Sequence, residues 1–153
     1  MKFAAATAIA FALLTGSLSH QAQAMQCVAY AKKATGFELR GDAWRWWGAA
    51  SGNYARGHAP IAGAVMVFDR THKMVHGHVA VVRSIKNSRE ILIDQANWNK
   101  GRSGRGAVSQ AVPVIDVSPN NDWSQVRVAA GGGNFGRVNP VLGFIYGDDL
   151  IQD

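Results

Sequence analysis

The order of hydrophobic and polar positions divides the chain into a short helical start and a longer stretch of strands. Helix-forming residues run from Val28 to Ala34, with two lysines in the last turn and Gly36 directly after it. This pattern predicts a helix that begins at or just before Cys27 and ends at a glycine cap. A second short helix is expected after Asp42, an N-cap residue, with Gly48 weakening its end.

From residue 64 onwards the pattern changes to short apolar or β-branched runs, separated by Gly, Asn, Ser and Pro. The expected strands are Ala64–Phe68, Val79–Ser84, Glu90–Ala96, Val112–Val117, Val126–Val128 and Gly143–Tyr146. Because no long helical pattern lies between them, the sequence predicts an α+β fold, with short N-terminal helices packed on one face of an antiparallel β-sheet. Residues 101–106 and 129–136 are expected to be surface loops.

The second and third of these strands are expected to form a hairpin, and its register decides which polar side chains meet. With a turn centred on residues 87–88, the numbers of opposed residues sum to 175. Asn97 then lies opposite His78, and Gln95 lies diagonally to His78 on the same face. An amide beside the histidine would fix its tautomer and leave its other ring nitrogen free to take a proton.

A three-residue turn would shift this register by one position. Asp94 would then reach the face of His78 and supply a charged partner in place of the amides. We prefer Gln95 and Asn97 as the groups that hold His78, and we keep Asp94 as the alternative.

The first 24 residues have the pattern of an export signal. Lys2 is followed by an apolar run from Phe3 to Leu14 and by the small-residue cleavage pattern at residues 22–24. We therefore expect residues 1–24 to be a signal peptide and residues 25–153 to form a single domain, delivered to the periplasm or the outside of the cell. The apolar run is too short for a stable membrane anchor.

Cys27 is the single cysteine of the chain, so it cannot form a disulfide within the chain. An unpaired thiol in an oxidising compartment is unusual, and a position at a helix N-terminus favours the thiolate. Cys27 is therefore a candidate nucleophile, with His78 as its candidate base. The alternative for Cys27 is a small, buried hydrophobic residue.

The net charge and the numbers of cysteine and histidine residues indicate which kinds of binding partner to expect. After removal of residues 1–24 the chain keeps 15 Lys and Arg against 10 Asp and Glu, a net charge of +5 that suits an acidic polymer. The cations are scattered, so we expect no nucleic-acid partner. The chain has a single cysteine, and most of its histidines are expected in loops, so we expect no metal site. We also expect that the protein needs no cofactor and is a monomer.

Three tryptophans, Trp44, Trp46 and Trp47, fall within four positions of the second predicted helix. Trp44 and Trp47 share a helix face, and core packing is the simplest role for the group. Trp46 lies off that face and is a candidate for lining a substrate groove.

Three motifs, in this order, resemble the CHAP family of cysteine, histidine-dependent amidohydrolases/peptidases: Gln-Cys-Val at residues 26–28, Gly-His-Val-Ala-Val-Val at 77–82 and Ala-Asn-Trp at 96–98. The resemblance implies a papain-like α+β fold and hydrolysis of amide bonds in peptidoglycan. It implies that Cys27 is the nucleophile and His78 the base, and it adds Trp98 to Trp46 as a candidate substrate-binding residue.

The chain departs from the family pattern at Gln95, where members often have glutamate, and at Ala64, where they often have aspartate. An uncharged partner stabilises imidazolium less than a carboxylate does. The sequence thus predicts a secreted cysteine amidase or endopeptidase that acts on peptidoglycan with Cys27, His78, Gln95 and Asn97. The alternative is a non-catalytic cell-wall-binding or adaptor protein on the same fold.

Overall fold

The structure, a computed structural model, describes residues 26–99 and 104–151. The expected signal peptide and the first part of the expected loop at 101–106 lie outside the described residues. The helical elements are α1 (Cys27–Thr35), η1 (Ala43–Arg45), α2 (Trp46–Ala49) and η2 (Asp148–Leu150). The strands are β1 (Ala55–Gly57), β2 (Val65–Phe68), β3 (His78–Asn87), β4 (Glu90–Ala96), β5 (Val108–Asp116), β6 (Gln125–Gly131) and β7 (Asn134–Tyr146).

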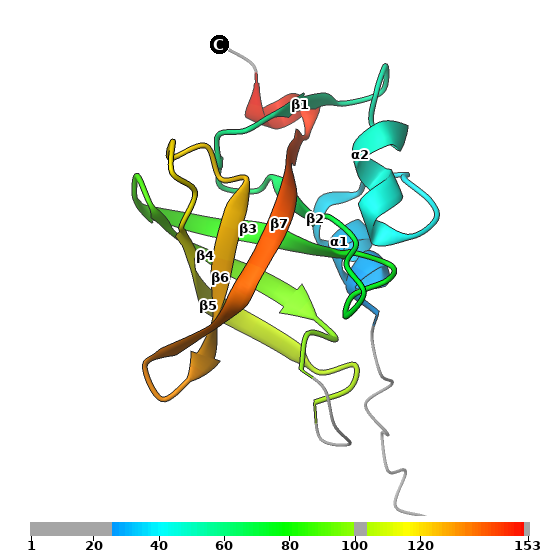
Figure 1. Cartoon of the computed structure of the whole chain (residues 1–153). Helices are drawn as coiled ribbons and strands as arrows, with labels where there is room; N and C mark the ends of the chain where they lie inside the picture. Colours follow the sequence, from blue (N-terminus) through cyan, green and yellow to red (C-terminus); the bar gives the residue numbers. More distant parts are fainter. Residues whose placement is uncertain (1–25, 100–103, 152–153) are drawn as a thin grey trace, which may run out of the picture.

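Six of these strands close into an antiparallel barrel, which Figure 1 shows with α1 and α2 on one side. The strand order is β7-β2-β3-β4-β5-β6, and β6 pairs back with β7, while β1 extends the sheet beside β7. Strands make up 45% of the described residues and helices 16%. The prediction of an α+β fold with helices layered on an open sheet was therefore wrong: the fold is mostly β.

The main error in the prediction concerns the length of β7, which pairs with β1, β2 and β6. Its last four residues were predicted as a strand, but its first nine contain glycine, proline and polar residues that indicate loops. For the same reason the stretch 129–136 was expected to be a loop, whereas it forms the end of β6, the turn and the start of β7. A strand long enough to reach both edges closes a sheet that would otherwise stay open.

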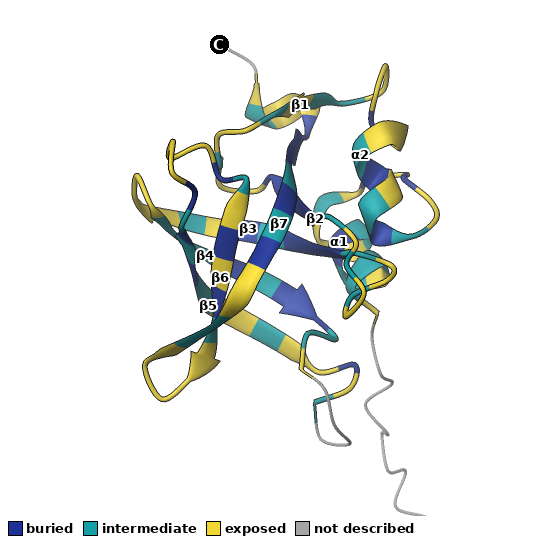
Figure 2. Ribbon diagram, viewed as in Figure 1, coloured by how far each residue is buried: buried dark blue, intermediate teal, exposed yellow. Residues whose placement is uncertain are grey.

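Two apolar clusters lie on opposite sides of the barrel wall. Met66 and Phe68 of β2 point into the barrel with Phe144, while Val65 and Val67 point outward. The outward residues pack against α1, α2 and the segment between them. Both faces of β2 are therefore buried, which explains its continuous apolar sequence and its dark colour in Figure 2.

Helix α1 begins at Cys27, as predicted, and ends where Gly36 takes a left-handed conformation and donates its N–H to the carbonyl of Lys32 at 2.8 Å. Ala31 is its fully buried residue and packs against the outer side of β2 and β3. The helix is thus held at the barrel wall beside the start of β3, which brings its first turn next to His78.

The β3–β4 hairpin has the predicted register at its functional end, although its turn is different. The turn is formed by Ser88 and Arg89, so the first opposed pair is Asn87 with Glu90. Their residue numbers add up to 177, whereas the predicted register requires 175. Two irregularities, each placing one extra residue on β3, lower the sum to 175 at the pair Val81 and Asp94. The predicted pairing of Val81 with Asp94 is therefore confirmed, because the bulges compensate for the misplaced turn.

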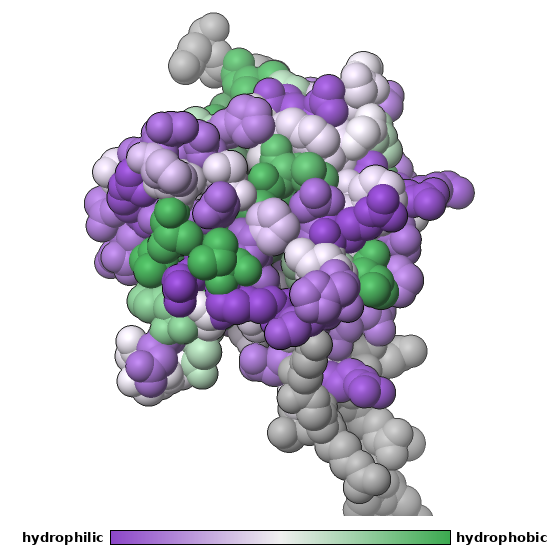
Figure 3. All heavy atoms as spheres, viewed as in Figure 1, coloured by the Kyte–Doolittle hydropathy of each residue, from purple (hydrophilic) through white to green (hydrophobic). Residues whose placement is uncertain are grey.

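The face seen in Figure 3 is mostly hydrophilic, with hydrophobic residues in separate patches. This distribution follows from the alternation along the strands. In β6, for example, Val126 and Val128 are buried while their neighbours Gln125 and Arg127 are exposed.

Substitution of Gly143 tests the packing around the closing strand. Gly143 has φ 145°, and an added Cβ would lie 2.6 Å from both the carbonyl oxygen of Gly57 and the ring of Trp47. We expect Gly143→Ala to lower the free energy of unfolding by about 2 kcal/mol or more, measured by denaturant titration. Gly48→Ala is the control: it adds the same methyl group to α2 in open space and should leave stability unchanged or slightly higher.

Candidate active site

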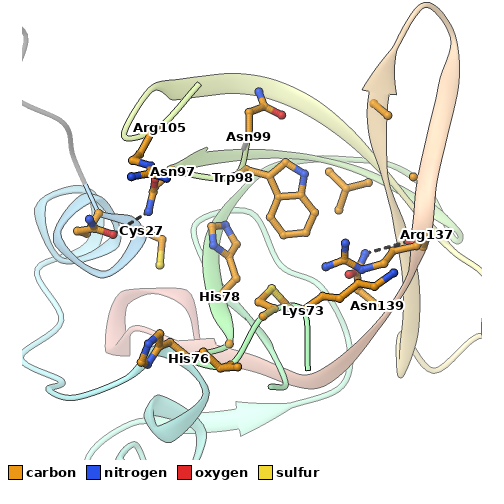
Figure 4. A pocket seen from close by; sticks show the side chains of 17 residues that line it. Cys27, Lys73, His76, His78, Asn97, Trp98, Asn99, Arg105, Arg137 and Asn139 are labelled. Carbon is orange, nitrogen blue, oxygen red and sulfur yellow. Dashed lines mark hydrogen bonds between the residues drawn. The ribbon is translucent and has the colours of Figure 1, made fainter. Parts of the chain in front are cut away.

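A cavity of about 610 Å³ opens at the end of the barrel where β4 finishes and β3 begins. The sequence-predicted residues Cys27, His78, Asn97 and Trp98 all line it, as Figure 4 shows. These residues come from the start of α1, the start of β3 and the segment after β4. A cavity of this volume is large enough for a short peptide or a similar ligand.

Cys27 is the first residue of α1 and is half-buried, and its side chain lies beside the His78 ring in Figure 4. Burial raises the pKa of the Cys27 thiol, while backbone N–H groups of Val79, Val28 and Cys27 itself lower it; the net direction is upward. The helix N-terminus was expected to favour the thiolate. Here desolvation outweighs that effect, so the resting group is a thiol.

His78 is 4% exposed and forms a buried hydrogen bond of 3.0 Å between its Nε2 and Oε1 of Gln95, which is 1% exposed. Because an amide oxygen can only accept, Nε2 carries the hydrogen and donates it. Nδ1 is then the unprotonated ring nitrogen. Burial lowers the pKa of His78 to about 4, although the bond to Gln95 partly opposes this shift, so the ring is neutral near pH 7.

The His78 ring is also held by aromatic neighbours. Its centroid lies 4.9 Å from that of Trp98 and 5.6 Å from that of Phe68, both edge to face. The residue before it, Gly77, has φ 66°, and an added Cβ would lie 2.7 Å from Cβ of Trp44. Glycine is therefore required at this position for the chain to enter β3 with His78 facing the cavity.

Asn97 does not contact His78 through any described hydrogen bond, although it was predicted to lie opposite. It has φ 60° and leaves the strand geometry at the end of β4. Its Nδ2 donates to Oε1 of Gln26 at 2.7 Å, and its Oδ1 accepts from the N–H of Gly106 at 2.8 Å. Asn97 thus ties the residue before Cys27 to the β4–β5 connection and positions the start of α1.

Asp94 lies on the other face of β4 from His78, as the chosen register predicted. One of its oxygens accepts from Nε of Arg83 at 2.8 Å and from the N–H of Ala111 at 2.8 Å. Ala111 has φ 52° at the irregularity in the pairing of β4 with β5. Asp94 therefore stabilises the outside of the barrel, and Gln95 is the group bonded to His78.

The two predicted substrate-binding tryptophans have different surroundings. Trp98 lines the cavity beside His78. Trp46 is fully buried in the cluster between the helices and the barrel wall, so its side chain is not available to a ligand. Trp44 and Trp47 instead line a separate shallow hollow, where arginine side chains lie over their rings.

Sequence reasoning missed the basic character of the cavity. Lys73, Arg105 and Arg137 all line it, and none of its described lining residues carries a carboxylate. These cations come from the β2–β3 loop, the β4–β5 connection and β7. Each is 32 residues from the next along the chain, so no local run of charge indicated that their side chains would line the same cavity.

Among residues 26–99 and 104–151, no three His, Cys, Asp or Glu side chains are grouped so that they could hold a metal ion. Within the same ranges no helix has the length and apolar character needed to span a membrane.

Comparison with solved structures gives a likeness of fold. An N-acetylmuramoyl-L-alanine amidase from Staphylococcus aureus aligns with 77% of this chain at 22% sequence identity and a TM-score of 0.50. The aligned part is 30% of that chain, so the present chain spans under a third of its neighbour's length. A search of curated proteins gave no match.

The family model described as the CHAP domain matches residues 18–97, which is 80 of the 153 residues. The matched segment contains Cys27, His78, Gln95 and Asn97. The resemblance inferred from three short motifs is thereby confirmed, and the chain belongs to the CHAP domain family.

Proposed function

We propose that this chain is a cysteine hydrolase that cleaves amide bonds of peptidoglycan through a thioester on Cys27. The observation that carries the proposal is the buried hydrogen bond from Nε2 of His78 to Gln95. It leaves Nδ1 as a proton acceptor in the same cavity as the thiol. Membership of the CHAP family and the likeness of fold to an amidase support a hydrolase of the peptidoglycan type.

The reaction begins from a neutral thiol and a neutral imidazole, because burial disfavours the charged form of both groups. Nδ1 of His78 takes the thiol proton as Sγ of Cys27 bonds to the amide carbonyl carbon. The carbonyl double bond opens in this step, so the carbonyl oxygen takes up the negative charge, and backbone N–H groups near Sγ stabilise it. Gln95 keeps the imidazolium oriented through Nε2.

The intermediate collapses when His78 gives its proton to the amide nitrogen and the carbon–nitrogen bond breaks. This step releases the amine and leaves the acyl group on sulfur as a thioester. A water molecule then loses a proton to Nδ1 and bonds to the acyl carbon. Cleavage of the carbon–sulfur bond releases the carboxylic acid, and Cys27 recovers its proton from His78.

We further propose that the reaction takes place outside the cytoplasmic membrane. The support is the pattern of residues 1–24, where a basic start, an apolar run and a small-residue site follow one another. The substrate polymer lies in the same compartment. Detection of a mature chain beginning at Met25 in the exported fraction would test this assignment.

Removal of the nucleophile tests the enzyme proposal. We expect Cys27→Ala to reduce release of soluble fragments from purified peptidoglycan by roughly a thousandfold or more, because the variant lacks the sulfur on which the acyl intermediate would form. Thermal unfolding should show that the variant keeps its fold. Alkylation of the wild type should remove activity, and chelators should not. Undiminished hydrolysis by Cys27→Ala contradicts the proposal, and a wild type that binds peptidoglycan without cleaving it indicates the non-catalytic alternative.

The partner of His78 can be identified by comparing two neighbouring positions on β4. Gln95→Ala should lower kcat by roughly tenfold or more with a smaller change in KM, because Nε2 loses its acceptor and the ring its orientation. Asp94→Asn is the matched control, since it changes the adjacent residue on the opposite face. It should keep most of the activity. A larger loss of kcat in Asp94→Asn than in Gln95→Ala would reject the assignment.

The lowered pKa of His78 also predicts how stability depends on pH. In the unfolded chain His78 binds a proton at its ordinary pKa of 6.5, whereas in the folded chain it does so at about 4. The unfolded state therefore binds more protons between these values, so the contribution is present above pH 6.5 and is lost as the pH falls to 4. The loss should be about 3 kcal/mol.

Denaturant titrations of wild type and His78→Gln from pH 7 to pH 4 measure this contribution. The decline with acid should be smaller in His78→Gln than in the wild type. Gln95→Glu should raise the pKa of His78 in an NMR titration, because a carboxylate stabilises imidazolium. Equal declines in wild type and His78→Gln would show that His78 is not buried in its neutral form.

A further inference from the structure

We propose that the side of the cavity away from Cys27 binds a free carboxylate of the substrate peptide, with Arg137 and Lys73 as its cationic partners. This inference rests on the proposed function and adds to it the class of peptide accepted. In Figure 4, Arg137, Lys73 and Asn139 lie together on one side of the cavity, with Cys27 on the other side and Trp98 and His78 between them.

The charges on this side support an anionic ligand. Arg137 and Lys73 are exposed residues of the same cavity, and its described lining residues include a third cation, Arg105, but no aspartate or glutamate. Cations that share a concave surface raise the local potential more than the same charges spread over a convex one. An arginine can also hold both oxygens of a carboxylate through two parallel hydrogen bonds.

Asn139 has two roles on this side of the cavity. Its side-chain amide holds the backbone of Arg137 in place, and its side-chain oxygen is a hydrogen-bond acceptor that has no donor in the described part of the chain. It is 2% exposed, and its Nδ2 donates to the carbonyl oxygen of Arg137 at 3.0 Å, which holds the backbone that carries the guanidinium. Its Oδ1 is buried without a hydrogen-bond partner among the described residues. Such an atom is uncommon in folded proteins and is suited to accept from an N–H of a bound peptide.

The apolar part of the cavity lining, here called its floor, suits a peptide rather than a free anion. Val128 and Ala130 of β6 line the cavity together with the Trp98 indole. A peptide whose amide carbonyl meets Cys27 can therefore lay its apolar parts on this floor and place a carboxylate beside Arg137. A small inorganic anion would gain only the electrostatic contact.

The test uses peptide fragments released from peptidoglycan, prepared with their carboxyl groups free or converted to carboxamides. Binding is measured by calorimetry with the Cys27→Ala variant, so that no turnover occurs. We expect the free acids to bind about tenfold more tightly than the amides at low salt, and less so as salt increases. Arg137→Gln in the same background should remove most of this preference without weakening binding of the amides.

Lys86→Gln is the control, because it removes one positive charge at the turn end of β3, far along the strand from His78. It should keep the preference for the free acids. Equal affinity of Cys27→Ala for acids and amides would overturn the carboxylate site, and so would a preference that survives Arg137→Gln. A preference for acids that depends on Arg137 supports the site even if the wild type cleaves neither peptide, in which case the proposed reaction alone fails.

Discussion

Closure of the sheet is the constraint on which the rest of this structure depends. Strand β7 pairs with β2 on one side and β6 on the other, so the inner faces of six strands enclose one apolar interior. His78 and Gln95 share the inward-facing side of β3 and β4 at the end of this interior. Water is largely excluded there, which lowers the pKa of His78 and makes its bond to Gln95 necessary.

The same burial sets the charge state of the candidate nucleophile and base. A thiolate and imidazolium pair is favoured where carboxylates and water stabilise the cation, but the partner of His78 here is an amide. Both groups are consequently neutral at rest, and the proton moves when sulfur attacks. An uncharged partner is compatible with this arrangement because its task is to hold the Nε2 hydrogen and the ring plane.

The cavity joins this neutral chemistry to a basic surface. Around Cys27 and His78 the described partners are backbone N–H groups, amides and aromatic rings. Toward β7 the lining includes Arg137 and Lys73. Anionic groups of a ligand would therefore be held away from the negative charge that develops on the carbonyl oxygen beside Cys27. Ligand recognition and bond cleavage thus use differently charged parts of the cavity.

The amino-acid sequence by itself determined those features of the site that depend on neighbouring residues in the chain. A lone cysteine at a helix start, a histidine at a strand start and an amide two residues before Asn97 were readable because they depend on neighbours close in the chain. Even the register of the hairpin followed from alternation at its functional end, despite two bulges that no local signal indicated. Burying one face of each strand leaves only one parity open to His78 and Gln95.

Features that depend on contacts between residues far apart in the chain were decided by the tertiary structure alone. Closure by β7 was hidden because its first half contains Gly136 and Pro140, which local propensity assigns to loops. Burial of Trp46, the meeting of three distant cations and the net upward shift of the Cys27 pKa all follow from that closure and from the helices packed on its wall. Propensity describes a residue among its neighbours in sequence, whereas desolvation and charge clustering are set by residues that only the completed barrel brings together.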